Sequence, residues 1–174
     1  PARHRFYADP HDPAGHGGQQ RGRQDWPVRR LRSRHRGHRQ QAGRCHCENE
    51  IISSITAAEP IGPKKLIDAL VIAPCTGNTL AKLANGITDT PVTMAAKAHL
   101  RNNRPLIIAL ATNDAMSANF KNLAALIERK NIYFVPLVQD DTVNKPCSLV
   151  ADFSQIEKTL EYALNGIQIR PLFL

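Results

Sequence analysis

The chain has 174 residues, 42% of them hydrophobic, which suits one domain with a buried core. Its formal net charge of +8 is concentrated in residues 1–50, which carry eleven Arg and six of the seven His but no Lys and no Ile. Because the charges nearly balance from Ile51 onward, the overall basicity does not indicate a nucleic-acid-binding domain. The sequence shows no apolar run of about 18 residues and no signal-peptide core, so we expect neither a transmembrane helix nor a membrane partner. Four Cys residues without a disulfide pattern predict a reduced, cytoplasmic protein.

Residues 1–48 have no hydrophobic period and are rich in Arg, His, Gly and Gln. Three hypotheses are open for this segment. It is a basic nucleic-acid-binding arm, or a sequence translated in a shifted frame and joined to the rest near Asn49, or a metal site. The metal site would use His35, His38, Cys45, His46 and Cys47. The abrupt change at Ile51 favours the shifted frame, and the Cys-His-Cys spacing argues against a metal site.

The chain therefore divides into residues 1–48, expected to be disordered or out of frame, and a folded domain over residues 49–174. A strand beside residues 69–73 in a parallel sheet must be apolar on both faces, and no window before Cys47 meets that condition. We predict that residues 1–48 have no stable fold and do not complete the sheet. That edge of the sheet would then be open and aggregation-prone.

The stretch from Asp68 to Asn85 organises the folded part. Residues 69–73 form an uninterrupted apolar run, which predicts a strand covered on both faces. Small polar residues follow at 75–79, and then Leu80, Leu83 and Ala84 recur at helical spacing up to Gly86. The segment is predicted to be a strand, a tight polar turn and a helix.

Later segments repeat this alternation, which predicts a doubly wound α/β fold with a parallel sheet. Before the first strand, Ile51, Ile52 and Ile55 begin a short apolar element, and residues 59–65 read as a loop. Further along the chain we expect a helix capped by Thr90 over residues 91–101, a strand at 106–111, a helix at 120–131, a strand at 132–137, a loop at 138–152 and a last helix with a Ser154–Glu157 capping box.

Two of the predicted strands end in polar turns, which would meet at one edge of a parallel sheet. The candidate binding residues are Cys75, Thr76, Gly77, Asn78 and Thr79 in the first turn and Thr112 and Asn113 in the second. Hydroxyls, amides and a helix N-terminus suit a phosphorylated, planar cofactor. No catalytic residue can be assigned: Cys75 is expected to be a small buried residue rather than a nucleophile, and His99 a surface residue late in a helix.

The segment from Pro74 to Asp89 resembles the Pro-x-Ser/Thr-x-Asn-Thr-x-x-Lys motif of the FMN-binding flavoproteins that include peptidyl-cysteine and phosphopantothenoylcysteine decarboxylases. Four further segments are similar to the B subunits of dipicolinate synthases, and the similarity runs from about Asn49 to the C-terminus. These segments are residues 58–65, 94–98, 111–115 and 130–136.

The resemblance implies a flavodoxin-like Rossmann layer, bound FMN and oxidation of dihydrodipicolinate to dipicolinate in the mother cell of a sporulating bacterium. It also implies an A subunit as partner and a homo-oligomer. Thr76, Asn78, Thr79, Thr112 and Asn113 would then contact the flavin, while the substrate carboxylates would meet one or more lysines. The candidate lysines are Lys64, Lys65, Lys82 and Lys97.

Two segments depart from the pattern of these proteins. Family members begin with a strand and a Gly/Thr/Ser turn that helps to bind the FMN phosphate, and residues 1–48 show no such turn, which predicts weakened FMN binding. The Pro-x-Met-Asn segment of the decarboxylases corresponds here to Ala111–Asp114, so decarboxylation is not implied. A non-catalytic subunit that binds and orients the A subunit is the alternative function.

Overall fold

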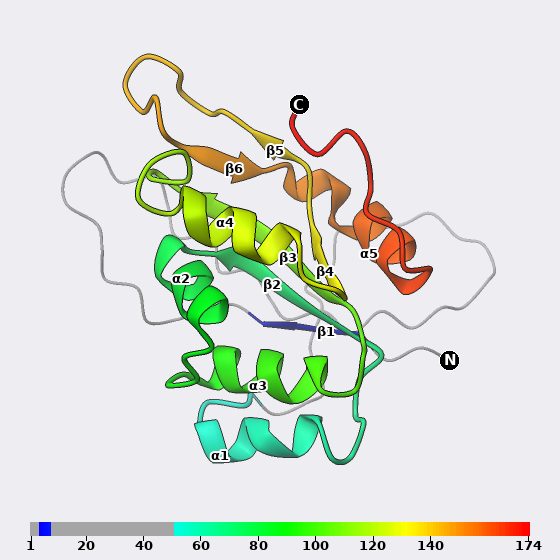
Figure 1. Cartoon of the computed structure of the whole chain (residues 1–174). Helices are drawn as coiled ribbons and strands as arrows, with labels where there is room; N and C mark the ends of the chain where they lie inside the picture. The colour runs from blue at the N-terminus through cyan, green and yellow to red at the C-terminus, as the bar shows by residue number, and fades with distance from the viewer. Residues whose placement is uncertain (1–3, 8–50) are drawn as a thin grey trace, which may run out of the picture.

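The computed structural model describes residues 4–7 and 51–174, and these form an α/β fold with a mostly parallel sheet (Figure 1). Strands β2 (Ala69–Cys75), β3 (Leu106–Thr112) and β4 (Ile132–Phe134) run parallel, with β3 between the other two. The side chains of β2 and β3 are almost all buried, because helices and loops cover the sheet. The predicted fold class is confirmed.

Strand β1 (His4–Tyr7) pairs in parallel with β2, with His4 opposite Ala69 and Tyr7 opposite Ile72. The prediction that nothing before residue 49 joins the sheet is therefore wrong for these four residues. An edge strand is held by backbone hydrogen bonds along one side only, so it does not need the continuous apolar run that an interior strand needs. The other residues of the segment, including the hypothetical metal ligands, lie outside the described residues.

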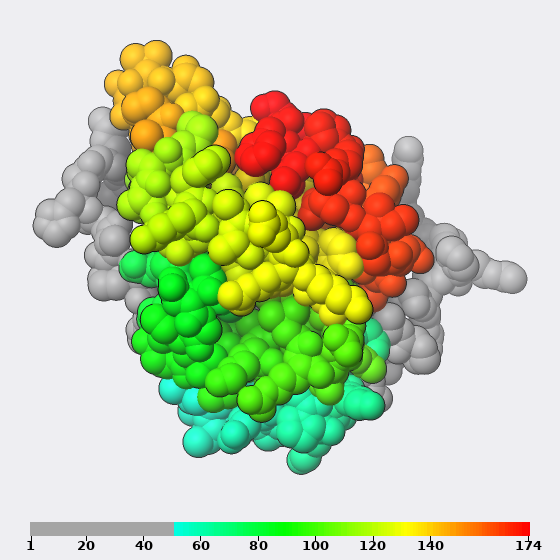
Figure 2. Space-filling model, viewed as in Figure 1, coloured from blue at the N-terminus to red at the C-terminus, as the bar shows by residue number. Residues whose placement is uncertain are grey.

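Three helices connect the parallel strands and lie over the sheet in Figure 1. Helices α2 (Gly77–Asn85) and α3 (Pro91–Leu100) join β2 to β3, and α4 (Phe120–Ile127) joins β3 to β4. The short helices α1 (Ile55–Ala58) and η1 (Glu59–Ile61) pack on α3. Figure 2 shows α2, α3 and α4 side by side on the same face of the molecule. The predicted start of α3 is confirmed: Thr90 caps it through a reciprocal capping box with Thr93.

Helices α2 and α4 contact each other and are also joined at one end by a side chain. The guanidinium group of Arg129, just after α4, donates to the carbonyl oxygens of Leu83 at 3.2 Å and Ala84 at 2.7 Å. These carbonyls belong to the last turn of α2, where a helix lacks internal donors.

The predicted strand at residues 132–137 and the loop that follows it need correction. β4 ends at Phe134, and a separate strand β5 (Leu137–Val138) begins after Pro136. The chain returns as β6 (Leu149–Ala151), which lies antiparallel between β5 and the end of β3. A proline cannot donate a ladder hydrogen bond, which explains the break at Pro136.

The last helix, α5 (Ile156–Leu164), is preceded by a single turn of 3-10 helix, η2 (Phe153–Gln155). The expected Ser154–Glu157 capping box is wrong, because Asp152 caps η2 by accepting from the backbone N–H of Ser154 at 3.1 Å. α5 packs against β3 and β4 as part of the core. Within the described residues no helix is long and apolar enough to cross a bilayer.

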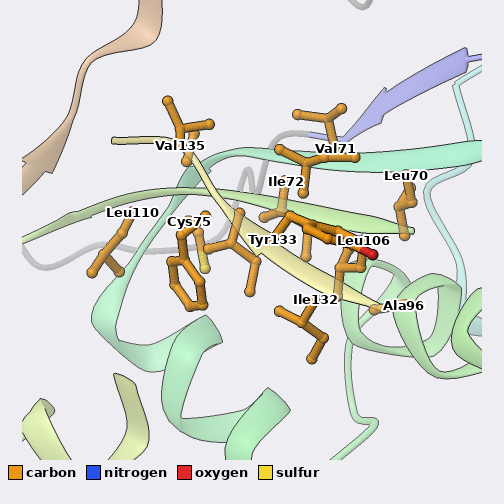
Figure 3. Packing of buried hydrophobic residues seen from close by; sticks show 14 of the residues in the cluster. Leu70, Val71, Ile72, Cys75, Ala96, Leu106, Leu110, Ile132, Tyr133 and Val135 are labelled. Carbon is orange, nitrogen blue, oxygen red and sulfur yellow. The ribbon is translucent and has the colours of Figure 1, made fainter. Parts of the chain in front are cut away.

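The core lies around β2, β3 and β4, and Figure 3 shows how closely its side chains gather there. Phe134 is among the largest side chains that are fully buried, at 1% exposure. Its backbone N–H donates to Oε1 of Gln168 at 2.8 Å, and its carbonyl oxygen accepts from Nε2 of Gln168 at 2.8 Å. The segment after α5 therefore closes the free edge of β4 at this position.

His99 is buried in the interior, at 1% exposure, so the expectation of a surface histidine is wrong. Its Nε2 lies 3.0 Å from the carbonyl oxygen of Pro105, which can only accept, so Nε2 carries the proton. Nδ1 is buried and has no hydrogen-bond partner in the part of the chain described. Burial lowers the pKa of His99 below its ordinary value of 6.5, with the charge of Arg104 as a smaller contribution in the same direction.

This depressed pKa predicts a stability that falls in acid. The unfolded chain takes up the His99 proton first, so the contribution of His99 is fully present above about pH 6.5 and is lost as the pH falls toward the folded-state pKa. Between pH 7.5 and 5.5, wild type should lose more stability than His99→Gln, which keeps a donor near Pro105. The linkage limit for one proton is about 1.4 kcal/mol per pH unit. Urea unfolding measures the difference, and an equal loss in both proteins would contradict it.

Candidate functional site

The carboxyl ends of β2 and β3 carry the two polar turns, which lie close together at the left end of the sheet in Figure 1. The two turns approach each other closely at Gly77. A Cβ atom built on Gly77 would lie 2.6 Å from Oγ1 of Thr112, 2.7 Å from Nδ2 of Asn119 and 3.0 Å from Oδ1 of Asp114. The predicted meeting of the two turns is therefore confirmed, and it depends on the missing side chain of a glycine.

The first turn is the N-terminus of α2. Thr76 caps the helix by accepting from the backbone N–H of Thr79 at 3.4 Å, and its own hydroxyl donates to Oγ1 of Thr79 at 3.3 Å. The first-turn N–H groups of a helix have no carbonyl partner within the helix, and the helix dipole makes this end electropositive. Gly77 and Asn78 occupy that first turn, and Asn78 is exposed. This end of α2 suits the oxygens of a phosphate or a polyol.

The second turn, between β3 and α4, is held by a chain of polar side chains. The hydroxyl of Thr112 donates to Oδ1 of Asp114. The other carboxylate oxygen of Asp114 accepts from Nδ2 of Asn119 at 2.8 Å. Asn119 in turn accepts from Nδ2 of Asn122 at 2.8 Å, and both asparagines are buried. Asp114 was predicted to lie in this polar turn but was not a candidate binding residue, and Asn119 and Asn122 were not predicted at all, because neither burial nor contacts can be read from spacing.

A third segment reaches the same place from β6. Thr112 pairs with Leu149, and the backbone N–H of Met116 donates to the carbonyl oxygen of Cys147 at 3.0 Å. Cys147 is a free, partly buried cysteine. The sequence predicts a loop for this stretch, so the contact with the end of β3 was not expected. The signal was weak, since β6 has three residues and no hydrophobic period of its own.

The predicted site residues differ in accessibility. Asn78 and Asn113 are exposed, Thr76 and Thr112 are partly buried, and Cys75, Gly77 and Thr79 are buried. Cys75 is fully buried, at 0% exposure, which agrees with the expectation of a small buried residue. The exposed amides and the hydroxyls at the two turns are therefore the groups that a ligand would meet first.

The four candidate lysines do not gather at this edge. Lys82 forms an ion pair with Asp89 at 3.1 Å. Lys64 and Lys65 precede β2, and Lys97 lies late in α3, so these three approach the opposite, amino-terminal ends of the parallel strands. The described residues contain no group of three His, Cys, Asp or Glu side chains that could hold a metal ion.

Parallel strands whose carboxyl ends carry a helix N-terminus and a second polar turn define an α/β protein of the nucleotide- and flavin-binding class. The comparison with known families is consistent with this class: the chain belongs to the flavoprotein family, whose model matches residues 33–162. This match begins within the Arg- and His-rich segment.

The predicted similarity to the B subunits of dipicolinate synthases is confirmed, and the chain is a homologue of these proteins. The dipicolinate synthase B subunit of Bacillus subtilis (strain 168) is 50% identical over 125 residues, which are 72% of this chain and 62% of that protein. The crystal structure of the dipicolinate synthase B subunit from Bacillus halodurans superposes with a TM-score of 0.72 at 47% identity, covering 73% of this chain and 65% of the other.

A more distant relative is the flavin prenyltransferase UbiX of Thermoplasma acidophilum, 34% identical over 95 residues, which are 50% of this chain and 53% of that protein. The chain thus spans less than two thirds of the length of each of these three proteins.

Proposed function

We propose that this chain is the flavin-binding subunit of a dipicolinate synthase, which oxidises dihydrodipicolinate to dipicolinate together with an A subunit. The observation that carries the proposal is the 50% identity over 125 residues to the B subunit of the Bacillus subtilis enzyme. We further propose, as the same similarity supports, that the protein acts in the cytoplasm of the mother cell during sporulation and forms a homo-oligomer.

FMN fits the groups that the two turns present. The backbone N–H groups at the start of α2, next to the Thr76 hydroxyl, can bind phosphate or ribityl oxygens. The exposed side-chain amides of Asn78 and Asn113 can form hydrogen bonds with the polar edges of the flavin ring. Both oxygens of the Asp114 carboxylate already accept hydrogen bonds, one from Thr112 and one from Asn119, so this negative charge is partly compensated within the turn. FMN, when bound, supplies a two-electron acceptor, and formation of an aromatic pyridine ring favours the oxidation.

In this proposal the chain binds and orients the flavin and the substrate. The substrate loses a hydride and a proton, and this step needs no further catalytic group from the protein. Thr76, Asn78, Thr79, Thr112 and Asn113 hold the flavin. Cys75 and Gly77 shape the turn from the buried side.

We predict that FMN stabilises the protein. FMN at 100 times its dissociation constant should add about 2.7 kcal/mol to the free energy of unfolding. For a chain of this size that corresponds to a rise in Tm of about 5–10 °C. Thermal unfolding monitored with and without FMN, beside a visible flavin spectrum of the purified protein, measures the effect. A Tm unchanged by FMN and a colourless protein would refute the flavin proposal.

A second candidate function is a non-catalytic subunit that binds and orients the A subunit. The hydrogen bonds that Asp114 accepts within its own turn favour this candidate, because they make its carboxylate less available as a general acid or base. Dihydrodipicolinate oxidation by the A subunit alone and by the two subunits together separates the two. A full rate without this chain supports the non-catalytic role, and a rate that requires both the chain and FMN supports the flavin-binding one.

A further inference from the structure

The hydrogen bonds among the side chains of the second turn fix the direction of the Thr112 hydroxyl group. Thr112 has a single hydroxyl proton, and a carboxylate oxygen can only accept, so that proton points at Asp114. The oxygen of Thr112 therefore offers only lone pairs to anything on its other side. Thr112 is a partly exposed residue at the place where the two turns approach each other.

Two asparagines hold the Asp114 carboxylate in place beside Thr112, Asn119 through the other carboxylate oxygen and Asn122 through Asn119. Asn119 accepts from Asn122 through Oδ1, which leaves its Nδ2 facing Asp114. Thr112 and Asn119 thus donate to different oxygens of the Asp114 carboxylate, and Asn122 donates to Asn119 from the far side. Asn119 and Asn122 are buried, so water does not compete readily for these bonds.

The two turns consequently have opposite preferences although Gly77 brings them into contact. The start of α2 is electropositive and donates N–H groups, which favours phosphate. The second turn presents an acceptor oxygen with a carboxylate directly behind it, which disfavours phosphate and favours a donor. The Cβ position on Gly77, 2.6 Å from Oγ1 of Thr112, shows how close the two surfaces are.

We propose that Asp114 and Asn119 are positioning residues that hold the Thr112 hydroxyl as a hydrogen-bond acceptor, so that this turn binds a donor group of the flavin, a ribityl hydroxyl or the ring N–H. The inference rests on the proposed flavin-binding function and adds the orientation of the ligand. The phosphate lies over the start of α2, and the donor group lies over Thr112.

Replacement of Thr112 tests the acceptor. Thr112→Val keeps the shape and removes the oxygen, so its affinity for FMN should fall about tenfold, whereas Thr112→Ser should bind within about twofold of wild type. Riboflavin affinity should fall in parallel, leaving the FMN-to-riboflavin ratio unchanged, because the phosphate contact lies at the other turn. A general loosening of the site would lower that ratio, and this result would overturn the proposal.

Lumiflavin, which has the ring but no ribityl chain, identifies the donor. If the ring N–H meets Thr112, Thr112→Val weakens lumiflavin as much as FMN. If a ribityl hydroxyl does, lumiflavin binds both proteins equally. An equal FMN affinity of wild type and Thr112→Val, in a protein that binds FMN, overturns this inference and leaves the proposed function standing. A wild-type protein that binds no FMN overturns both.

An exchange of side chains tests the positioning role. Asn119→Asp places two carboxylates in contact and should weaken FMN binding at least fivefold. Adding Asp114→Asn restores every bond: the amide oxygen introduced at position 114 accepts from Thr112, and its NH₂ group donates to the carboxylate introduced at 119, which still accepts from Asn122. The double variant should bind FMN within about twofold of the wild-type affinity. Its urea-unfolding midpoint should return close to the wild-type value. A double variant no better than Asn119→Asp alone would overturn the positioning role.

Discussion

Replacing Gly77 with alanine is expected to lower the affinity for FMN by at least about tenfold, equivalent to roughly 1.4 kcal/mol of binding free energy. The added methyl group would lie 2.6 Å from Oγ1 of Thr112 and 2.7 Å from Nδ2 of Asn119, well inside van der Waals contact. The two turns must separate to admit it, which also removes about 1–3 kcal/mol of stability, the usual cost of overpacking. Isothermal titration with FMN and urea unfolding measure the two effects.

Gly86→Ala is the matched control for this variant. Gly86 adopts a left-handed conformation with φ of +71° at the end of α2, and a Cβ there would meet no atom within 4 Å. Its replacement should cost about 1–2 kcal/mol of stability through backbone strain alone, while FMN affinity stays at the wild-type value. Similar losses of FMN affinity in both variants would show that lowered stability, and not the contact between the turns, explains the result.

Phe134→Ala should lower the free energy of unfolding by about 3–5 kcal/mol, the range measured for deletion of large buried aromatic side chains. Phe134 is 1% exposed and lies on β4 within the main core, where the surrounding side chains cannot fill the space. The two backbone hydrogen bonds to Gln168 do not involve the deleted ring, so the loss reports packing.

Phe120→Ala provides the comparison at the same residue type. Phe120 begins α4 and is 55% exposed, so its replacement should change stability by no more than about 0.5 kcal/mol. Urea denaturation of both variants, with the slope of the transition compared, measures the difference. A small effect of Phe134→Ala would show that the core around β4 is less tightly packed than the structure indicates.

The central strands could be predicted because their residues are determined by burial on both faces. Residues 69–73 and 106–111 have no polar alternation, and the structure places them in β2 and β3. The start of α3 was predictable as well, since Thr90 satisfies backbone donors locally, whereas the expected Ser154–Glu157 box did not form because Asp152 caps the preceding turn. The meeting of the two turns followed from the rule that parallel strands end at one edge.

Contacts between segments distant in the chain were not predictable from local pattern. The antiparallel return of β6 depends on pairing with the end of β3, and its three residues carry no period. The burial of His99 depends on its hydrogen bond to Pro105 and on the packing of α3 against β2 and β3. At the site, the sequence identified Thr112 but not Asp114 or Asn119, because a side chain's partners are decided by the fold.

The link from Arg129 to the last turn of α2 has a consequence for the motion of the two helices. Its guanidinium group ties α4 to α2 at one end, through Leu83 and Ala84. At the other end, Gly77 at the start of α2 lies close to Asn119, which directly precedes α4. Contacts at both ends oppose shearing or splaying of the two helices, so we expect the pair to move together. The spacing of the turns is therefore set before a ligand arrives, and binding requires little loss of conformational entropy.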